Sequence, residues 1–101
     1  MAKWADYRIY RQRMSEGQIM SLPCVIDDGG LPLKRNQREF MKEAVIERIE
    51  KGSTFVTMFY KSGEWTRGAN VRVQKAANGK KYLRTDPNNI DADNLGNLPK
   101  I

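Results

Sequence analysis

Residues 36–51 constrain the fold most, because they form the one stretch with a clear helical repeat. Asn36 is a helix-capping residue type, and Glu39 stands three residues later, as in a capping box. Apolar residues then recur at helical spacing and form one stripe, namely Phe40, Met41, Ala44, Val45 and Ile49. Gly52 follows, a residue type that ends helices in the left-handed conformation. The sequence therefore predicts one amphipathic helix, whose apolar stripe needs a partner surface.

Shorter segments on both sides of this helix have strand character. Alternating or β-rich patterns predict strands at residues 7–14, 18–26, 54–60, 64–75 and 80–85. Pro23 has no N–H to donate, so it predicts that the second of these strands is an edge strand or is bulged. Gly68 predicts a bulge in the fourth strand. The third strand is apolar on both faces, which favours a central position.

These elements together predict an α+β fold in a single domain spanning residues 1–101. We expect one helix packed on an antiparallel sheet of about five strands, in the order β-β-α-β-β-β, with an irregular C-terminal tail. Residues 1–85 form the expected folded core. The C-terminal tail, residues 86–101, carries isolated apolar side chains that we expect to dock back on it, namely Ile90, Leu95 and Leu98.

The last two predicted strands flank an Asn-Gly hairpin signal whose register can be derived. A two-residue loop would place Val73 opposite Arg84 and put an arginine on the apolar face. A three-residue loop of residues 77–79 pairs Val73 with Leu83 instead, so the face stays apolar. It also lets Gly79 take the left-handed position that such loops need. We therefore predict the three-residue loop.

The same register sets Arg72 opposite Arg84. Two guanidinium groups whose Cβ atoms are about 5 Å apart repel unless something negative lies between them. The negative group is either a carboxylate of the C-terminal tail, from Asp86, Asp91 or Asp93, or the phosphate of a bound ligand. The sequence leaves both explanations open.

Several function classes are disfavoured by composition. The chain has no histidine and one cysteine, Cys24, so we expect no zinc site and no His-based catalytic set. Asp27-Asp28, followed by two glycines, marks a turn rather than a metal site. No phosphate-cradling glycine loop is present, and we predict no enzyme activity and no cofactor. Without an apolar run of about 20 residues or a signal peptide, we expect no membrane association and a cytoplasmic location.

The final strand and the tail contain the motifs Tyr82-Leu83-Arg84-Thr85, Asp93-Asn94-Leu95 and Leu98-Pro99. With the Ile49-x-x-Gly52 helix end and the strand after it, these motifs resemble a family of small bacterial and phage-borne proteins, domain-of-unknown-function family 3892. The resemblance spans most of the chain. It implies a compact α+β domain and supplies no activity and no catalytic residues.

Charge provides the main functional hypothesis. The net charge is +6, and residues 54–85 contain seven basic side chains against one acidic side chain. We hypothesise a non-catalytic protein that binds a phosphate-containing anion, a nucleotide or a nucleic acid, on a basic sheet face. The predicted binding residues are Arg67, Arg72, Lys75, Lys80, Lys81, Tyr82 and Arg84. Two alternatives remain: a protein-interaction module or homodimer that uses apolar surface around Trp4 and Trp65, and a basic face that only aids solubility.

Overall fold

The computed structural model describes residues 3–30, 34–86, 92–96 and 98–100. In this part of the chain there are eight strands, one α-helix and one 3₁₀ turn. Their bounds are β1 (Tyr7–Ile9), β2 (Arg13–Ser15), β3 (Gln18–Ile26), η1 (Lys34–Asn36), β4 (Gln37–Met41), α1 (Lys42–Glu50), β5 (Phe55–Lys61), β6 (Glu64–Asn70), β7 (Arg72–Lys75) and β8 (Lys81–Arg84). No helix in these residues is long and apolar enough to cross a membrane.

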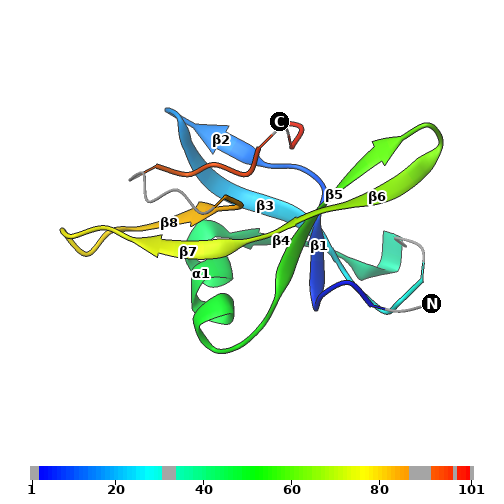
Figure 1. Ribbon diagram of the computed structural model, residues 1–101, viewed down its shortest axis with the longest axis horizontal. Helices are drawn as coiled ribbons and strands as arrows, with labels where there is room; N and C mark the ends of the chain where they lie inside the picture. The colour runs from blue at the N-terminus through cyan, green and yellow to red at the C-terminus, as the bar shows by residue number, and fades with distance from the viewer. Residues whose placement is uncertain (1–2, 31–33, 87–91, 97, 101) are drawn as a thin grey trace.

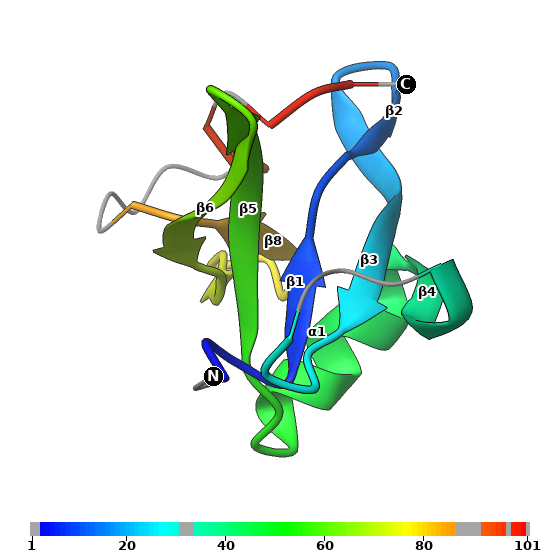
Figure 2. The ribbon, with the colours of Figure 1, turned by 90° about the vertical axis from the view of Figure 1, so that its right-hand side faces the viewer.

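The strands form two sheets with α1 against them (Figures 1 and 2). A six-stranded sheet runs in the order β2-β3-β1-β5-β6, with β4 also paired to β3, and β7 pairs with β8 in a separate sheet. The helix packs against β3, β4 and β7. The predicted α+β class agrees with this arrangement. The predicted single antiparallel sheet of about five strands is wrong, because β1 and β5 are parallel and the strands divide between two sheets.

The helix is shorter than predicted. Residues 37–41 form strand β4, which pairs antiparallel with β3, so α1 starts at Lys42 instead of Asn36. Neither predicted capping residue caps it: Asn36 donates a hydrogen bond to Asp28, and Glu39 accepts from Arg13. The backbone edge of β3 offers hydrogen-bond partners to residues 37–41. This strand pairing competes with the hydrogen bonds that the same residues would make in a helix. The predicted end is confirmed, since Gly52 has φ +103° directly after the last turn.

The first predicted strand, residues 7–14, is divided into β1 and β2, and both pair with β3. β3 has β4 on its other side, so it is an interior strand and not an edge strand. The predicted alternative, a bulge, is present, because Arg13 pairs with Ser21 and Met14 with Ile19, which leaves one extra residue on β3. Pro23 is tolerated because it lies opposite the break between β1 and β2, where no strand residue requires a backbone N–H from position 23. Its carbonyl still accepts a hydrogen bond from the Tyr10 amide at 3.3 Å.

The predicted strand over residues 64–75 also divides, into β6 and β7, which lie in different sheets. The predicted bulge at Gly68 is confirmed. Val56 pairs with Asn70 and Met58 with Arg67, so two residues of β6 oppose one residue of β5. The amide of Ala69 donates to Thr57 Oγ1 at 3.0 Å, which closes the bulge.

Replacing Gly68 with alanine is expected to destabilise the protein by about 1–3 kcal/mol, because the site has no room for a methyl group. A Cβ atom there would overlap Thr57 Oγ1 and lie 2.7 Å from Phe59 Cε2. Gly30→Ala is the matched control, since its Cβ would meet nothing closer than 3.4 Å. Chemical denaturation of both variants measures the difference. Equal stabilities would show that the bulge is loosely packed.

The hairpin register is confirmed. Val73 pairs with Leu83 and Arg72 with Arg84, and the Ala76 amide donates to the Lys80 carbonyl at 2.8 Å around a three-residue loop. Gly79 has φ +89°, the left-handed conformation that this loop requires.

The C-terminal tail contributes to the core. Leu95 and Leu98 are buried in the same cluster as Ile9, Val45 and Leu83, as predicted, whereas Ile90 lies outside the described residues. Cys24 is fully buried in this cluster, and burial raises the pKa of its thiol to about 12. The thiol therefore acts as a small apolar side chain and not as a nucleophile.

The buried side chain of Asp93 attaches the tail to the core. Its Oδ1 accepts the Leu83 amide at 2.9 Å, and its Oδ2 accepts the Ile19 amide at 3.0 Å. The Lys42 ammonium group also donates to Oδ2, at 2.8 Å. One carboxylate thus links the tail to β3, β8 and the start of α1.

Candidate functional site

The predicted arginine pair lies where the sequence places it, but Arg84 is already neutralised. It is 3% exposed, and its guanidinium donates to both carboxylate oxygens of Asp86 at 2.8 Å and to the Ala92 carbonyl at 2.8 Å. Arg72 Nε donates to the Asp86 carbonyl at 2.6 Å, and its Nη1 donates to Gln74. Of the two explanations for the pair, the tail carboxylate is the one observed at Arg84. A phosphate would have to displace Asp86 to bind there.

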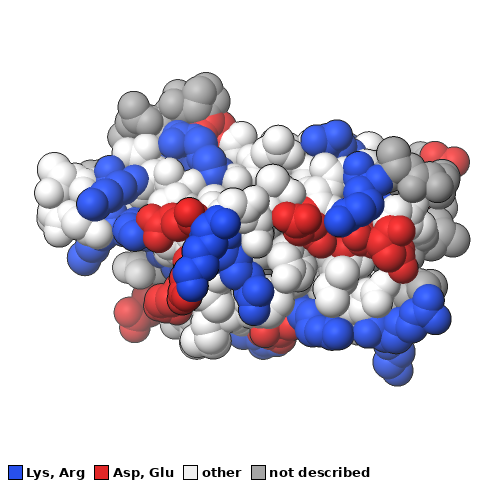
Figure 3. Space-filling view, turned by 90° about the horizontal axis from the view of Figure 1, so that it is seen from below, with Lys and Arg blue, Asp and Glu red and all other residues white. Residues whose placement is uncertain are grey.

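Three other predicted residues come together around a groove of about 380 Å³ between α1 and the β7–β8 hairpin, namely Lys80, Lys81 and Tyr82. Lys81 is paired with Glu50 at 2.6 Å, and the Lys42 ammonium group lies 5.1 Å from the centre of the Tyr82 ring. In the view from below, positive side chains lie beside negative ones over much of the surface (Figure 3). Lys75 on β7 pairs with Lys81 across the hairpin, whereas Arg67 on β6 lies in the six-stranded sheet.

A larger concave site lies on the six-stranded sheet. We call it the aromatic groove; its volume is about 700 Å³, and its lining residues are Tyr10, Arg11, Val25, Gln37, Met58, Phe59, Tyr60, Lys61, Trp65 and Pro99. Val25 and Met58 are buried and form the floor. Pro99 is held by its carbonyl, which accepts the Gln12 amide at 2.8 Å. The groove thus combines residues from both ends of the chain with the central strands.

Three aromatic rings stand together in the groove. Tyr60 pairs with Trp65 across the β5–β6 hairpin, and their ring centroids are 5.2 Å apart at 80°. Tyr10, just after β1, lies 6.4 Å from Trp65 at 71°. Burial raises the pKa of the Tyr10 phenol above its ordinary value. Tyr60 is 62% exposed, which leaves much of its surface open to a ligand.

Two cations line the groove without a carboxylate partner. Arg11 and Lys61 are both exposed, and neither forms an ion pair with any residue in the described part of the chain. The Lys61 ammonium group lies 5.7 Å from the centre of the Phe59 ring. The groove therefore combines aromatic rings with unneutralised positive charge, in contrast to the site at Arg84.

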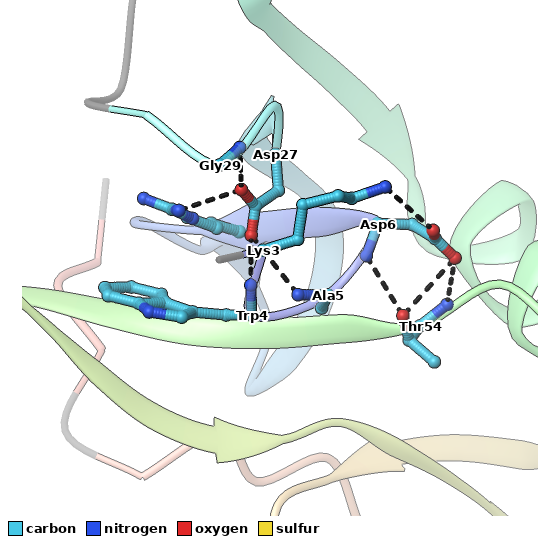
Figure 4. A network of polar contacts seen from close by, with 8 residues as sticks. Lys3, Trp4, Ala5, Asp6, Asp27, Gly29 and Thr54 are labelled. Carbon is cyan, nitrogen blue, oxygen red and sulfur yellow. Dashed lines mark hydrogen bonds and ion pairs between the residues drawn. The ribbon is translucent and has the colours of Figure 1, made fainter. Parts of the chain in front are cut away.

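A buried ion pair fixes β1 beside the groove (Figure 4). Asp27 accepts hydrogen bonds from Arg8 at 2.8 Å and from the amides of Trp4, Ala5 and Gly29 at 2.7, 3.2 and 2.8 Å. Burial alone would raise the pKa of Asp27, but these donors lower it to about 2. The Trp4 ring covers the Arg8 guanidinium at 4.0 Å. Because Arg8 and Tyr10 share one face of the strand, this network helps to position the groove.

The sequence predicts no nucleotide-binding role for the residues of the aromatic groove, and Trp65 enters only as part of the alternative protein-interaction surface. One signal was available: Ser62-Gly63 makes a two-residue loop with φ +50° and +80°, which sets Tyr60 opposite Trp65. The position of Tyr10 beside them follows from the parallel pairing of β1 with β5, which no local pattern predicts.

Comparison with known proteins identifies a family. No curated protein and no solved structure matches the chain. Among the described residues, no group of three or more His, Cys, Asp or Glu side chains is arranged to hold a metal ion. A family model described as a protein of unknown function, DUF3892, matches residues 8–99. Since this match covers nearly all of the chain, the protein belongs to the DUF3892 family.

Proposed function

We propose that this protein is a non-catalytic binding protein that holds a nucleotide or a nucleic acid in the aromatic groove. The observation that carries the proposal is the cluster of Tyr10, Tyr60 and Trp65 beside two unpaired cations. Aromatic side chains stack on nucleobases, and arginine and lysine attract phosphate. The groove volume of about 700 Å³ is within the range of small-molecule sites.

The charge around the rings selects among ligands. A group of three aromatic rings also suits a quaternary ammonium ion, which binds through cation–π attraction. Arg11 and Lys61 would repel such a cation, and the whole chain carries a net charge of +6. An anion with a planar ring satisfies both features at once. The proposed ligand is thus of the anion class predicted from the sequence, and the proposed site is the aromatic groove instead of Arg72 and Arg84.

Binding is expected to quench the fluorescence of Trp65, because a stacked base would contact its ring. The chain has two tryptophans, so a Trp4→Phe background isolates this signal. ATP and a twelve-residue oligothymidylate serve as probes. Tyr60→Ala in this background is expected to weaken binding about 5- to 100-fold, the equivalent of one lost stacking contact. Unchanged affinity in a folded Tyr60→Ala variant would argue against the groove.

A matched pair of double variants separates the two basic regions. Arg11→Ala with Lys61→Ala should weaken binding at least tenfold, whereas Lys75→Ala with Lys80→Ala, which removes the same charge, should change it less than threefold. Circular dichroism checks that both remain folded. If the Lys75 and Lys80 variant loses binding and the other does not, the ligand site is the smaller groove and the proposal fails.

The alternative proposal, a protein-interaction module or homodimer, uses the same surface. Tyr60 is 62% exposed, and in the described residues β6 pairs only with β5, so both a ring and a strand edge are open to a partner. Size-exclusion chromatography with light scattering tests the homodimer. A strict monomer at high protein concentration contradicts it, and a dimer that Tyr60→Ala dissociates supports it.

A further inference from the structure

We infer that the ligand of the aromatic groove is a single-stranded nucleic acid and not a free nucleotide. This inference rests on the proposed function and adds the class of ligand. It follows from where the unneutralised cations lie relative to the rings, and from how open the rings are.

Cations lie on both sides of the Tyr60–Trp65 pair along the β5–β6 hairpin. On the loop side, Lys61 lines the groove and stands opposite Glu64, although strand alternation starts its side chain from the Phe59 face of the hairpin. On the other side, Arg67 is two residues beyond Trp65 and faces Met58 of the groove floor. With a rise of about 3.3 Å per residue, the rows that contain Lys61 and Arg67 are about 10 Å apart. Arg67 is not a lining residue of the groove, so a ligand that contacts Arg67 as well as Arg11 and Lys61 must extend beyond the groove, as a strand with successive phosphates does.

Arg67 is suited to such a contact. It is exposed, and within the described part of the chain its guanidinium makes one hydrogen bond, to the neutral amide of Asn70 at 3.3 Å. Because alternate residues of a strand share a face, Arg67 projects on the same side as Trp65. Glu64 is the single acidic residue of residues 55–70. It pairs in register with Lys61 but makes no ion pair with it among the described residues. Three cations, Arg11, Lys61 and Arg67, are thus left for phosphates around the rings.

The openness of the groove disfavours a free nucleotide. Small-molecule sites bury most of the ligand surface. Here the stacking ring of Tyr60 is 62% exposed, and the positive groups are separate side chains rather than a loop of backbone amides. A base must leave a duplex stack to reach rings that stand in a groove, so unpaired strands are favoured over duplexes. An open platform of rings flanked by cations is typical of single-strand binding.

The test measures the binding of four ligands to the Trp4→Phe protein, with Trp65 fluorescence as the signal. The ligands differ in length, in sugar or in strandedness. The ligands are thymidine monophosphate, a twelve-residue oligothymidylate, a twelve-residue oligouridylate and a duplex of the same length. We expect either twelve-residue strand to bind at least tenfold more tightly than the nucleotide and the duplex. The affinities of the oligothymidylate and the oligouridylate, compared with each other, show whether DNA or RNA is preferred. The logarithm of the binding constant should fall with the logarithm of salt with a slope of about −2, since each of three phosphate contacts contributes about 0.7.

Arg67→Ala provides the matched variant. It should weaken binding of the twelve-residue strand and reduce the salt slope by about 0.7, while it leaves nucleotide binding unchanged. Lys75→Ala, an equal loss of charge on β7, should change neither. If the nucleotide binds as tightly as the strand, or if Arg67→Ala affects both equally, the inference is overturned while the proposed function stands. If no ligand quenches Trp65, the proposed function fails and the inference fails with it.

Discussion

Replacing Asp27 with asparagine is expected to destabilise the protein by about 3–5 kcal/mol, because it breaks a buried ion pair from one side. Both carboxylate oxygens accept hydrogen bonds: Oδ1 from Arg8 and Gly29, and Oδ2 from Trp4 and Ala5. In either orientation of an asparagine side chain, its NH₂ group would replace one of these acceptor oxygens and face two N–H donors. Arg8 would also remain buried without its counter-charge, and its Nε already has no hydrogen-bond partner among the described residues. Urea denaturation measures the loss.

The neighbouring carboxylate is a matched control. Asp28 is exposed and accepts hydrogen bonds from Gly30 and Asn36, so Asp28→Asn removes the same charge from the same turn. We expect a cost below about 1 kcal/mol for this exposed site. If Asp27→Asn lowers the free energy of unfolding as little as Asp28→Asn does, the Asp27 network contributes little to stability.

Low pH should lower the stability of the wild-type protein, because it protonates the Asp27 carboxylate. The pKa of Asp27 in the fold is about 2, below its ordinary value of 3.8. The group therefore contributes stability that is fully present above about pH 4 and is lost as the pH falls towards 2, an effect of about 2 kcal/mol. The stability difference between wild type and Asp27→Asn should shrink over this range. A constant difference between pH 5 and pH 2 would contradict the assignment.

The second large effect is expected for Asp93→Ala, with a loss of about 3 kcal/mol or more. The substitution leaves the buried amides of Ile19 and Leu83 without an acceptor and removes the partner of Lys42. It also removes the attachment of the C-terminal tail, whose Leu95 is buried in the core. Thermal and urea denaturation measure the loss.

Lys42→Ala separates the two contributions at Asp93. It removes the ion pair and keeps both backbone amides bonded, so we expect a cost well below that of Asp93→Ala. If the two variants are equally destabilised, the ion pair and not the amide bonds holds the tail.

Local patterns predicted the parts of this fold that local interactions determine. The hairpin register followed from the requirement that Val73 and Leu83 share an apolar face, and Gly68 marked its bulge correctly. The end of the helix at Gly52 followed from backbone sterics alone. In each case the decisive interaction joins residues that are near one another in sequence.

The errors arose where distant strands compete. Residues 37–41 have a helical pattern, but pairing with β3 makes them a strand. β1 runs parallel to β5, more than 40 residues away in the chain, and that pairing brings Tyr10 beside Trp65. The sequence named Asp86 as one possible partner of Arg84 but left a bound phosphate as the other, because the path of the tail depends on distant contacts.

The position of Asp93 has a consequence for synthesis of the chain. A ribosome releases residues in order, so Asp93, Leu95 and Leu98 emerge after the other residues of the core cluster. Until then the nascent chain exposes Leu83 and Ile19 without the leucines that cover them. The core of this domain can therefore close only once Asp93, Leu95 and Leu98 have emerged, and a chain truncated before residue 92 is expected to aggregate.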